Sequence, residues 1–383
     1  MPSHAPIITS LYVHVPFCIH RCHYCDFYTV LLEEGRTAAL VDGLIAELNL
    51  QRQTQHFEID TVFIGGGTPT ALPRDEFESL LAALSQLLPE REVEFTVEAN
   101  PATVDDAMLR TLIAGQVNRI SFGAQSFVPG ELAMLERAHG PAAIGQSVDK
   151  AVEAGIDNVS IDLIYGIPGQ TLQSWKQSLA SALRLPITHI SAYSLTYEPN
   201  TPLTTKMRRG LVQKMDESHE RELYETTMDY FEDAGFIQYE ISNFARDGYY
   251  CKHNLAYWKS ANWLGIGPSA ASHVAGNRFK NIPSLARYLE MIEAGESAAV
   301  ESERLPDRQR IGEAAMLLLR LNEGIDVTQF NRVYDTDVHE LFAEPMAKFS
   351  GLGFLVTEGN VALTRQARFV ADTILREFLT DGE

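Results

Sequence analysis

Short hydrophobic runs alternate with longer amphipathic segments along the first 243 residues of the chain. The short runs are rich in β-branched and aromatic residues, which favours β-strands. Seven strands are predicted in this way, at Leu11–Val15, Thr61–Ile64, Val93–Val97, Arg119–Phe122, Val159–Leu163, His189–Ser194 and Gln238–Ser242. Hydrophobic residues at intervals of three and four predict helices between them, at Ala38–Leu50, Phe77–Leu88, Ala107–Ala114, Ile144–Ala154 and Leu172–Leu183.

This alternation predicts parallel strands joined by crossover helices. Six or so such units indicate an α/β fold, a partial (β/α)6 barrel that is TIM-like, and not an antiparallel sandwich. We assign this barrel to residues 1–243 and expect its sheet to end near Asn243.

The pattern changes beyond this point. Residues 244–285 are rich in Tyr, Trp, His and Gly without a clear period, which predicts a loop-rich linker or lid. Residues 286–383 predict a smaller C-terminal helical domain. Its helices are expected at Ile311–Leu321, Val338–Gly351 and Ala367–Leu379, with a hairpin over residues 354–364. Helix, helix, hairpin and helix in this order suggest a winged-helix-like unit.

Composition narrows the functional classes. The chain has 383 residues, 45% of them hydrophobic, and a formal net charge of −20 from 31 basic and 51 acidic residues. Such a charge disfavours nucleic-acid binding, which needs clustered Lys and Arg. The sequence offers no evident targeting segment and no hydrophobic run of membrane-spanning length. We therefore expect a cytoplasmic protein.

Unusual polar groups follow several predicted strands at or near their carboxyl ends. They are the cysteine-rich loop after Leu11–Val15, the run Gly65 to Thr70, Glu98, Gln125 and Asp162. In parallel barrels this rim forms the active site. Residues more than 140 positions apart are therefore expected to meet at one mouth.

Three of the four cysteines, Cys18, Cys22 and Cys25, form a C-x3-C-x2-C pattern. Three thiolates suit a [4Fe-4S] cluster in which one iron lacks a protein ligand. A disulfide would leave one thiol over and would need an oxidising compartment. A zinc site is the stronger alternative, since several histidines lie nearby, but zinc loops usually present paired C-x2-C knuckles.

The run Gly65-Gly66-Gly67-Thr68-Pro69-Thr70 lies between a predicted strand and a helix. Backbone amides freed by glycine could hold an anionic or zwitterionic group there. The run matches neither a Walker loop nor a Rossmann fingerprint. A simple tight turn explains it equally well when it is considered alone.

Together, the cysteine loop and the glycine run resemble the radical S-adenosylmethionine superfamily. The resemblance implies that the cysteines hold the cluster and that the glycine-rich strand end binds the methionyl group of S-adenosylmethionine. It further implies that reduction of the cluster breaks a carbon–sulfur bond and yields a 5′-deoxyadenosyl radical.

Further motifs resemble the HemN/HemW branch of this superfamily over nearly the whole chain. They are YVHVPFC from Tyr12, GGGTPT from Gly65, QSF from Gln125, RAH from Arg137 and DLIYGIPG from Asp162. The positions that match the branch's S-adenosylmethionine contacts are Tyr12, Gly66, Gly67, Thr68, Glu98, Gln125, Arg137 and Asp162.

In two features the chain resembles the haem chaperones of this branch, the HemW group, more closely than it resembles the HemN dehydrogenases. Phe27 occupies the position of a fourth HemN cysteine, and the segment from Cys251 contains H-N-x-x-Y-W, a motif associated with haem binding in HemW proteins. The resemblance implies haem contacts at His253, Asn254, Tyr257 and Trp258. An imidazole can ligate haem iron and aromatic faces suit a porphyrin, but these residues can equally pack a linker onto the barrel.

The resemblance therefore implies a haem chaperone that carries a [4Fe-4S] cluster and S-adenosylmethionine. The alternative is an oxygen-independent coproporphyrinogen III dehydrogenase, and a third reading is another radical substrate on the same scaffold, so whether the chain is an enzyme stays open. Expected partners are haem, recipient haem proteins, including ones at a membrane surface, and a reductant for the cluster. Nucleic acid is not expected, and a homodimer is left open.

Overall fold

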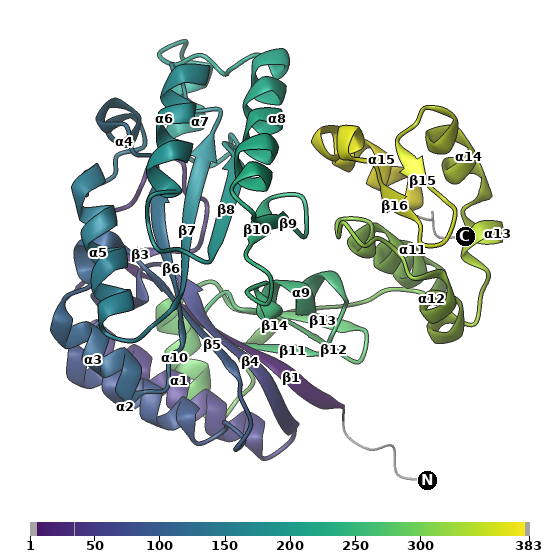
Figure 1. Ribbon diagram of the computed structural model, residues 1–383. Helices are drawn as coiled ribbons and strands as arrows, with labels where there is room; N and C mark the ends of the chain where they lie inside the picture. The colour runs from purple at the N-terminus through teal and green to yellow at the C-terminus, as the bar shows by residue number, and fades with distance from the viewer. Residues whose placement is uncertain (1–5, 34, 380–383) are drawn as a thin grey trace, which may run out of the picture.

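A computed structural model describes residues 6–33 and 35–379. A central twelve-stranded sheet has the order β14-β13-β12-β11-β1-β4-β5-β6-β7-β8-β10-β9. Helices cover its outer face, and a separate group of helices lies to one side (Figure 1). The main hydrophobic core lies between the sheet and these covering helices.

Six strands run parallel in sequence order, and β1 pairs with β4 but not with β8. These strands are β1 (Ile7–Val15), β4 (His56–Gly66), β5 (Glu94–Ala99), β6 (Arg119–Gln125), β7 (Asn158–Tyr165) and β8 (His189–Ser194). The connecting helices are α1 (Arg36–Arg52), α2 (Arg74–Ser85), α3 (Asp106–Ala114), α4 (Pro129–Met134), α5 (Pro141–Glu153) and α6 (Leu172–Ala182). The predicted partial (β/α)6 barrel is confirmed.

The sheet does not end near Asn243, so that expectation is wrong. Strand β10 (Asn243–Ala245) pairs antiparallel with β8, and β9 (Ile237–Gln238) pairs antiparallel with β10. At the other side, β11 (Trp263–Ile266) lies beside β1 and parallel to it. The antiparallel strands β12 (Ala271–Val274), β13 (Asn277–Asn281) and β14 (Ala299–Arg304) follow. Residues 244–285 therefore supply a helix, α9 (Lys252–Trp258), and three strands of the sheet instead of a loop-rich lid.

Glycine explains why this part of the sheet is hard to recognise. A Cβ atom at Gly265 would lie 2.2 Å from the carbonyl oxygen of Ala271, so the close approach of β11 and β12 needs glycine there. Because β11 and β12 have only four residues each and the segment contains glycines, the alternation of hydrophobic and polar residues that marks a strand is too short to recognise. Helix α10 (Leu285–Glu293) then packs against α1. Both α10 and β14 belong to the barrel side of the molecule, although nearly all of their residues fall in the range assigned to the C-terminal domain.

The C-terminal unit has its own hydrophobic core. It contains α11 (Asp307–Leu318), α12 (Val327–Tyr334), α13 (Val338–Leu341), α14 (Ala343–Gly351), the hairpin β15 (Leu355–Val356) and β16 (Ala362–Leu363), the 3₁₀ helix η3 (Arg365–Val370), α15 (Ala371–Leu375) and the 3₁₀ helix η4 (Arg376–Phe378). The predicted hairpin is confirmed. The helices expected at 338–351 and 367–379 are interrupted, the first at Phe342, three residues before Pro345.

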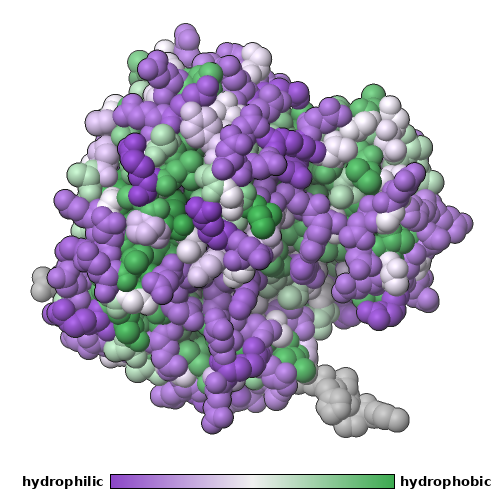
Figure 2. Space-filling model, in the orientation of Figure 1, coloured by the Kyte–Doolittle hydropathy of each residue, from purple (hydrophilic) through white to green (hydrophobic). Residues whose placement is uncertain are grey.

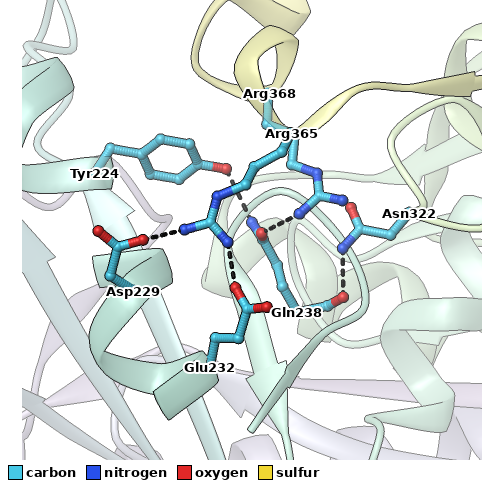
Figure 3. Close-up of polar contacts among 7 residues, drawn as sticks. All are labelled: Tyr224, Asp229, Glu232, Gln238, Asn322, Arg365 and Arg368. Atoms are coloured by element: carbon cyan, nitrogen blue, oxygen red, sulfur yellow. Dashed lines mark hydrogen bonds and ion pairs between the residues drawn. The ribbon is translucent and has the colours of Figure 1, made fainter. Parts of the chain in front are cut away.

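A polar contact joins the C-terminal unit to α8 (Glu217–Asp233) and β9, as Figure 3 shows. Arg365 pairs with Asp229 and Glu232, and we call these two ion pairs the latch. Nη1 of Arg368 donates to Oε1 of Gln238 at 2.6 Å. The same contact also has a packed part, because Phe369 packs against the main core and Glu240 forms a backbone bridge with Leu321. The two exposed ion pairs of the latch lie at its rim.

Short elements complete the barrel mouth. They are β2 (Phe17–Cys18), β3 (Val30–Leu31), the 3₁₀ helices η1 (Pro69–Ala71) and η2 (Pro101–Thr103), and α7 (Pro202–Arg208). Hydrophilic residues cover most of the face seen in Figure 2, in keeping with the strongly negative charge. In the part of the chain that the structure describes, no helix is long and apolar enough to cross a membrane.

Candidate cluster and S-adenosylmethionine site

The cysteine loop begins where β2 ends. Cys18 is the last residue of β2, and the backbone N–H of Cys25 donates to the carbonyl oxygen of Cys22 at 3.3 Å. All three thiols are half-buried and none of them forms a disulfide within the described residues. The disulfide alternative therefore finds no support in the geometry.

The glycine run holds the start of this loop by its backbone. The N–H of Gly67 donates to the Val15 carbonyl at 2.8 Å, and that of Thr68 to the Phe17 carbonyl at 2.7 Å. A Cβ atom at Gly67 would lie 2.5 Å from the Phe17 carbonyl oxygen. Glycine is thus required because two backbones pass close to each other.

Two side chains donate toward cysteine sulfurs. Oγ1 of Thr68 lies 3.7 Å from Sγ of Cys18, and Nη1 of Arg137 lies 3.3 Å from Sγ of Cys22. Nη2 of Arg137 also donates to the Gly123 carbonyl at 2.7 Å, which fixes the guanidinium. Burial raises the pKa of the Cys18 thiol, and it raises the pKa of Cys25 to about 11.

This donor set fits an iron–sulfur cluster. Three sulfurs line one cavity beside the half-buried guanidinium of Arg137. Coordination to a metal deprotonates thiols whatever their pKa is without the metal. Cys18, Cys22 and Cys25 would hold the cluster, and Arg137 would offset the charge of its thiolates. When bound with S-adenosylmethionine, such a cluster supplies an electron that cleaves a carbon–sulfur bond.

Two half-buried carboxyl groups line the same cavity as the cysteine loop. Glu98 of β5 accepts from the backbone N–H of Gly66 at 3.0 Å, and Asp162 of β7 accepts from Oγ of Ser121 at 3.2 Å. Burial and the charge of Asp162 raise the pKa of Glu98 to about 7, and burial also raises that of Asp162. Such groups can accept from ribose hydroxyls or an ammonium group.

One cavity of about 480 Å³ joins these features, a volume within the range of small-molecule sites. Phe27 lies at this cavity and is 59% exposed. The predicted residues that line the cavity are Cys18, Cys22, Cys25, Gly66, Gly67, Thr68, Glu98, Gln125, Arg137, Asp162 and Asn254. Gln125 has a φ of 65°, next to a bulge that shifts the register of β6 against β7 between Gly123 and Gln125.

The remaining predicted residues lie outside the cavity lining of the described chain: Tyr12, His253, Tyr257 and Trp258. The hydroxyl of Tyr12 lies 3.0 Å from Nδ1 of His14, whose Nε2 lies 2.9 Å from the Tyr28 carbonyl oxygen. His14 in turn lies behind Gly66, where a Cβ atom would come within 2.4 Å of the imidazole. Tyr12 therefore supports the glycine run from behind.

His253 is enclosed, with 1% of its surface exposed. Its Nδ1 lies 2.7 Å from Oγ1 of Thr61 and its Nε2 lies 2.8 Å from the hydroxyl of Tyr257. The imidazole stacks on Phe63 at 5.1 Å between ring centres. Burial lowers the pKa of His253 to about 3, so the ring is neutral, and both of its nitrogens already have partners.

Helix α9 connects the cavity to the C-terminal unit. A carboxylate from β5, Glu94, accepts from the first backbone amides of the helix, those of Lys252 at 2.8 Å and His253 at 3.0 Å. At its other end the guanidinium of Arg320 lies 4.9 Å from the Trp258 ring. Burial raises the pKa of neighbouring Cys251 to about 12, so this side chain is a thiol at neutral pH.

Several cavity residues escape motif reasoning, among them Arg119, Ser121, Ser191 and Tyr193. Arg119, Ser121, Gly123 and Gln125 alternate along β6 and all line the cavity. Ser191 and Tyr193 alternate in the same way along β8. A period of two along these two predicted strands is the signal that could have found all four residues.

Comparison with known proteins agrees with this geometry. Residues 12–182 match the Radical SAM superfamily and residues 305–370 match the HemN C-terminal domain. The solved structure of coproporphyrinogen III oxidase (HemN) from Escherichia coli superposes with a TM-score of 0.85, covering 98% of this chain and 90% of that one at 22% identity. This likeness establishes the shared fold.

Sequence relatives narrow the family. The chain is 35% identical to the heme chaperone HemW of Lactococcus lactis, over 97% of each chain. It is 34% identical to the heme chaperone HemW of Bacillus subtilis, over 97% of this chain and 99% of that protein. The chain belongs to the HemW family of the radical S-adenosylmethionine superfamily.

Proposed function

We propose that the chain is a haem chaperone that binds haem, a [4Fe-4S] cluster and S-adenosylmethionine, and delivers haem to recipient haem proteins. The observation that carries the proposal is the similarity over 97% of the chain to proteins named heme chaperone HemW. The exposed Phe27 at the mouth, where a fourth cysteine would stand in HemN enzymes, agrees with it.

Cluster and cofactor are assigned to the cavity. Cys18, Cys22 and Cys25 would ligate the cluster, and S-adenosylmethionine would lie between the glycine run and the two half-buried carboxyl groups, Glu98 and Asp162. A reductant for the cluster, a cytoplasmic location, recipients at a membrane surface and a homodimer all belong to the proposal.

Haem is assigned to the region of α9, by the motif His253-Asn254 to Tyr257-Trp258. Ligation by His253 requires α9 to move, because both imidazole nitrogens are hydrogen-bonded and the ring is buried. The C-terminal unit covers α9 at Trp258 and through the ion pair of Lys259 with Glu323 at 3.0 Å. We therefore propose that haem enters when this unit swings away from the barrel.

A haem titration followed by absorption tests the proposal, with His253→Ala compared against Thr61→Val. Both variants break the hydrogen bond at Nδ1, but only His253→Ala removes the imidazole. We expect saturable one-to-one binding by the wild type and Thr61→Val and none by His253→Ala. No saturable shift in the wild type would contradict the chaperone, and protoporphyrinogen formation from coproporphyrinogen III would favour the dehydrogenase instead.

A further inference from the structure

An arginine closes the floor of the cavity without a partner. Arg119 opens β6, is 2% exposed and lines the cavity. Among residues 6–33 and 35–379, its Nε–H has no hydrogen-bond partner and its guanidinium forms no ion pair. Desolvating a charged group without acceptors costs several kcal/mol, so a guanidinium in this state calls for an acceptor that the chain itself does not provide.

A second unpartnered group lies on the neighbouring strand. Thr96 of β5 is the register partner of Arg119, and its Oγ1 is buried without a hydrogen bond. Thr96 is 0% exposed. Two neighbouring polar side chains on the barrel interior thus lack partners at the same level of the sheet.

The acids nearest to Arg119 are committed elsewhere. Glu94 accepts from two backbone amides at the start of α9, and Asp162 accepts from Ser121. Their charges favour the cation at Arg119, but neither carboxylate lies within ion-pair distance of it. The guanidinium keeps its charge at every physiological pH, and up to five N–H donors face this floor.

The floor lies beneath the level assigned to S-adenosylmethionine. Glu98 pairs in register with Ser121, two residues further along β6 than Arg119. Gln125 lies six residues from Arg119, about 20 Å along a strand at ~3.3 Å per residue. A ligand that reaches Arg119 therefore extends below the layer of Glu98 and Asp162.

We propose that the floor at Arg119 is a carboxylate-binding subsite. The planar guanidinium matches a carboxylate with two parallel hydrogen bonds, which a lysine cannot reproduce. Two proposed ligands of this protein carry a carboxylate. Haem carries its propionates, and S-adenosylmethionine carries a methionyl carboxylate, which would reach Arg119 only by extending below the glycine run to which the resemblance assigns it. Binding of a haem propionate at Arg119 rests on the proposed function. Binding of the methionyl carboxylate rests only on membership of the family.

The test measures the affinities of four probes for the cluster-loaded wild type, Arg119→Met and Arg119→Lys. The probes are haem, haem with both propionates esterified, S-adenosylmethionine and its decarboxylated analogue. Charge-assisted hydrogen bonds of ~1.5 to 3 kcal/mol correspond to roughly 10- to 100-fold weaker binding in the variants. A propionate at Arg119 predicts this loss for haem and none for its ester. A methionyl carboxylate predicts it for S-adenosylmethionine and none for its analogue.

Equal affinities of all three proteins for haem and for S-adenosylmethionine would overturn the subsite, as would equal losses for a ligand and its carboxylate-free form. A purely structural role predicts that second pattern, because disturbing the fold weakens both forms alike. If Arg119→Met does not fold, the test uses Arg119→Lys, because lysine keeps the positive charge but cannot donate two parallel hydrogen bonds to a carboxylate. A wild type that binds no haem would contradict the chaperone, while the S-adenosylmethionine arm would still decide the subsite.

Discussion

Replacing His253 by alanine is expected to destabilise the protein by about 3 kcal/mol at pH 7.5. The change removes two buried hydrogen bonds, to Thr61 at 2.7 Å and to Tyr257 at 2.8 Å, each contributing ~1 kcal/mol. Loss of the stacked contact with Phe63 and the cavity left behind add about 1 kcal/mol or more. Urea denaturation followed by tryptophan fluorescence measures the difference, since Trp258 ends α9.

The stability difference between the wild type and this variant should depend on pH. The pKa of His253 is lowered to about 3 in the folded protein, so the unfolded chain binds a proton below about pH 6.5 while the folded protein does not. Stability from this group is thus lost as pH falls from about 6.5 toward 3. At pH 5 the loss is ~2 kcal/mol, and the gap between wild type and His253→Ala should shrink to about 1 kcal/mol. A gap below 1 kcal/mol at pH 7.5, or one that is constant with pH, would refute this reasoning.

Three further predictions concern the cluster, the cofactor and the latch. Anaerobically reconstituted wild type should contain about four irons and four sulfides per chain and Cys22→Ser far fewer, as elemental analysis can check. Because the pKa of Glu98 is raised to about 7, S-adenosylmethionine affinity by equilibrium dialysis should rise as pH passes upward through 7, while Glu98→Gln should give a flat profile. Arg365→Ala removes the latch pairs with Asp229 and Glu232, so stability should fall by less than about 1 kcal/mol while stopped-flow haem association becomes faster; an unchanged rate would argue against entry beneath the C-terminal unit.

Much of the barrel is predictable because its strands are local. Runs such as Val159–Leu163 are β-branched and bounded by turns, and their order in the sheet follows the sequence. Glu98 and Asp162 are found for the same reason, since carboxyl groups near the ends of parallel strands meet at one mouth. Strand β11 is not found, because its place beside β1 depends on contacts between residues about 250 positions apart.

The orientation of α9 is also beyond a sequence argument. Seven residues make two turns, and neighbouring positions point in different directions: His253 toward β4, Asn254 to the cavity and Trp258 to Arg320. A motif identifies these residues as a group but does not say which of them is enclosed. Only the packing of the helix between two units decides that.

The backbone hydrogen bonds that hold the cysteine loop have a consequence for how the protein responds to oxygen. Main-chain bonds from Gly67 and Thr68 anchor the strand that leads into Cys18, and none of these bonds involves iron. Oxidative loss of the iron–sulfur cluster should consequently leave the conformation of the cysteine loop unchanged. Ferrous iron and sulfide should restore a bleached sample without any unfolding step, so a cell could repair this protein instead of replacing it.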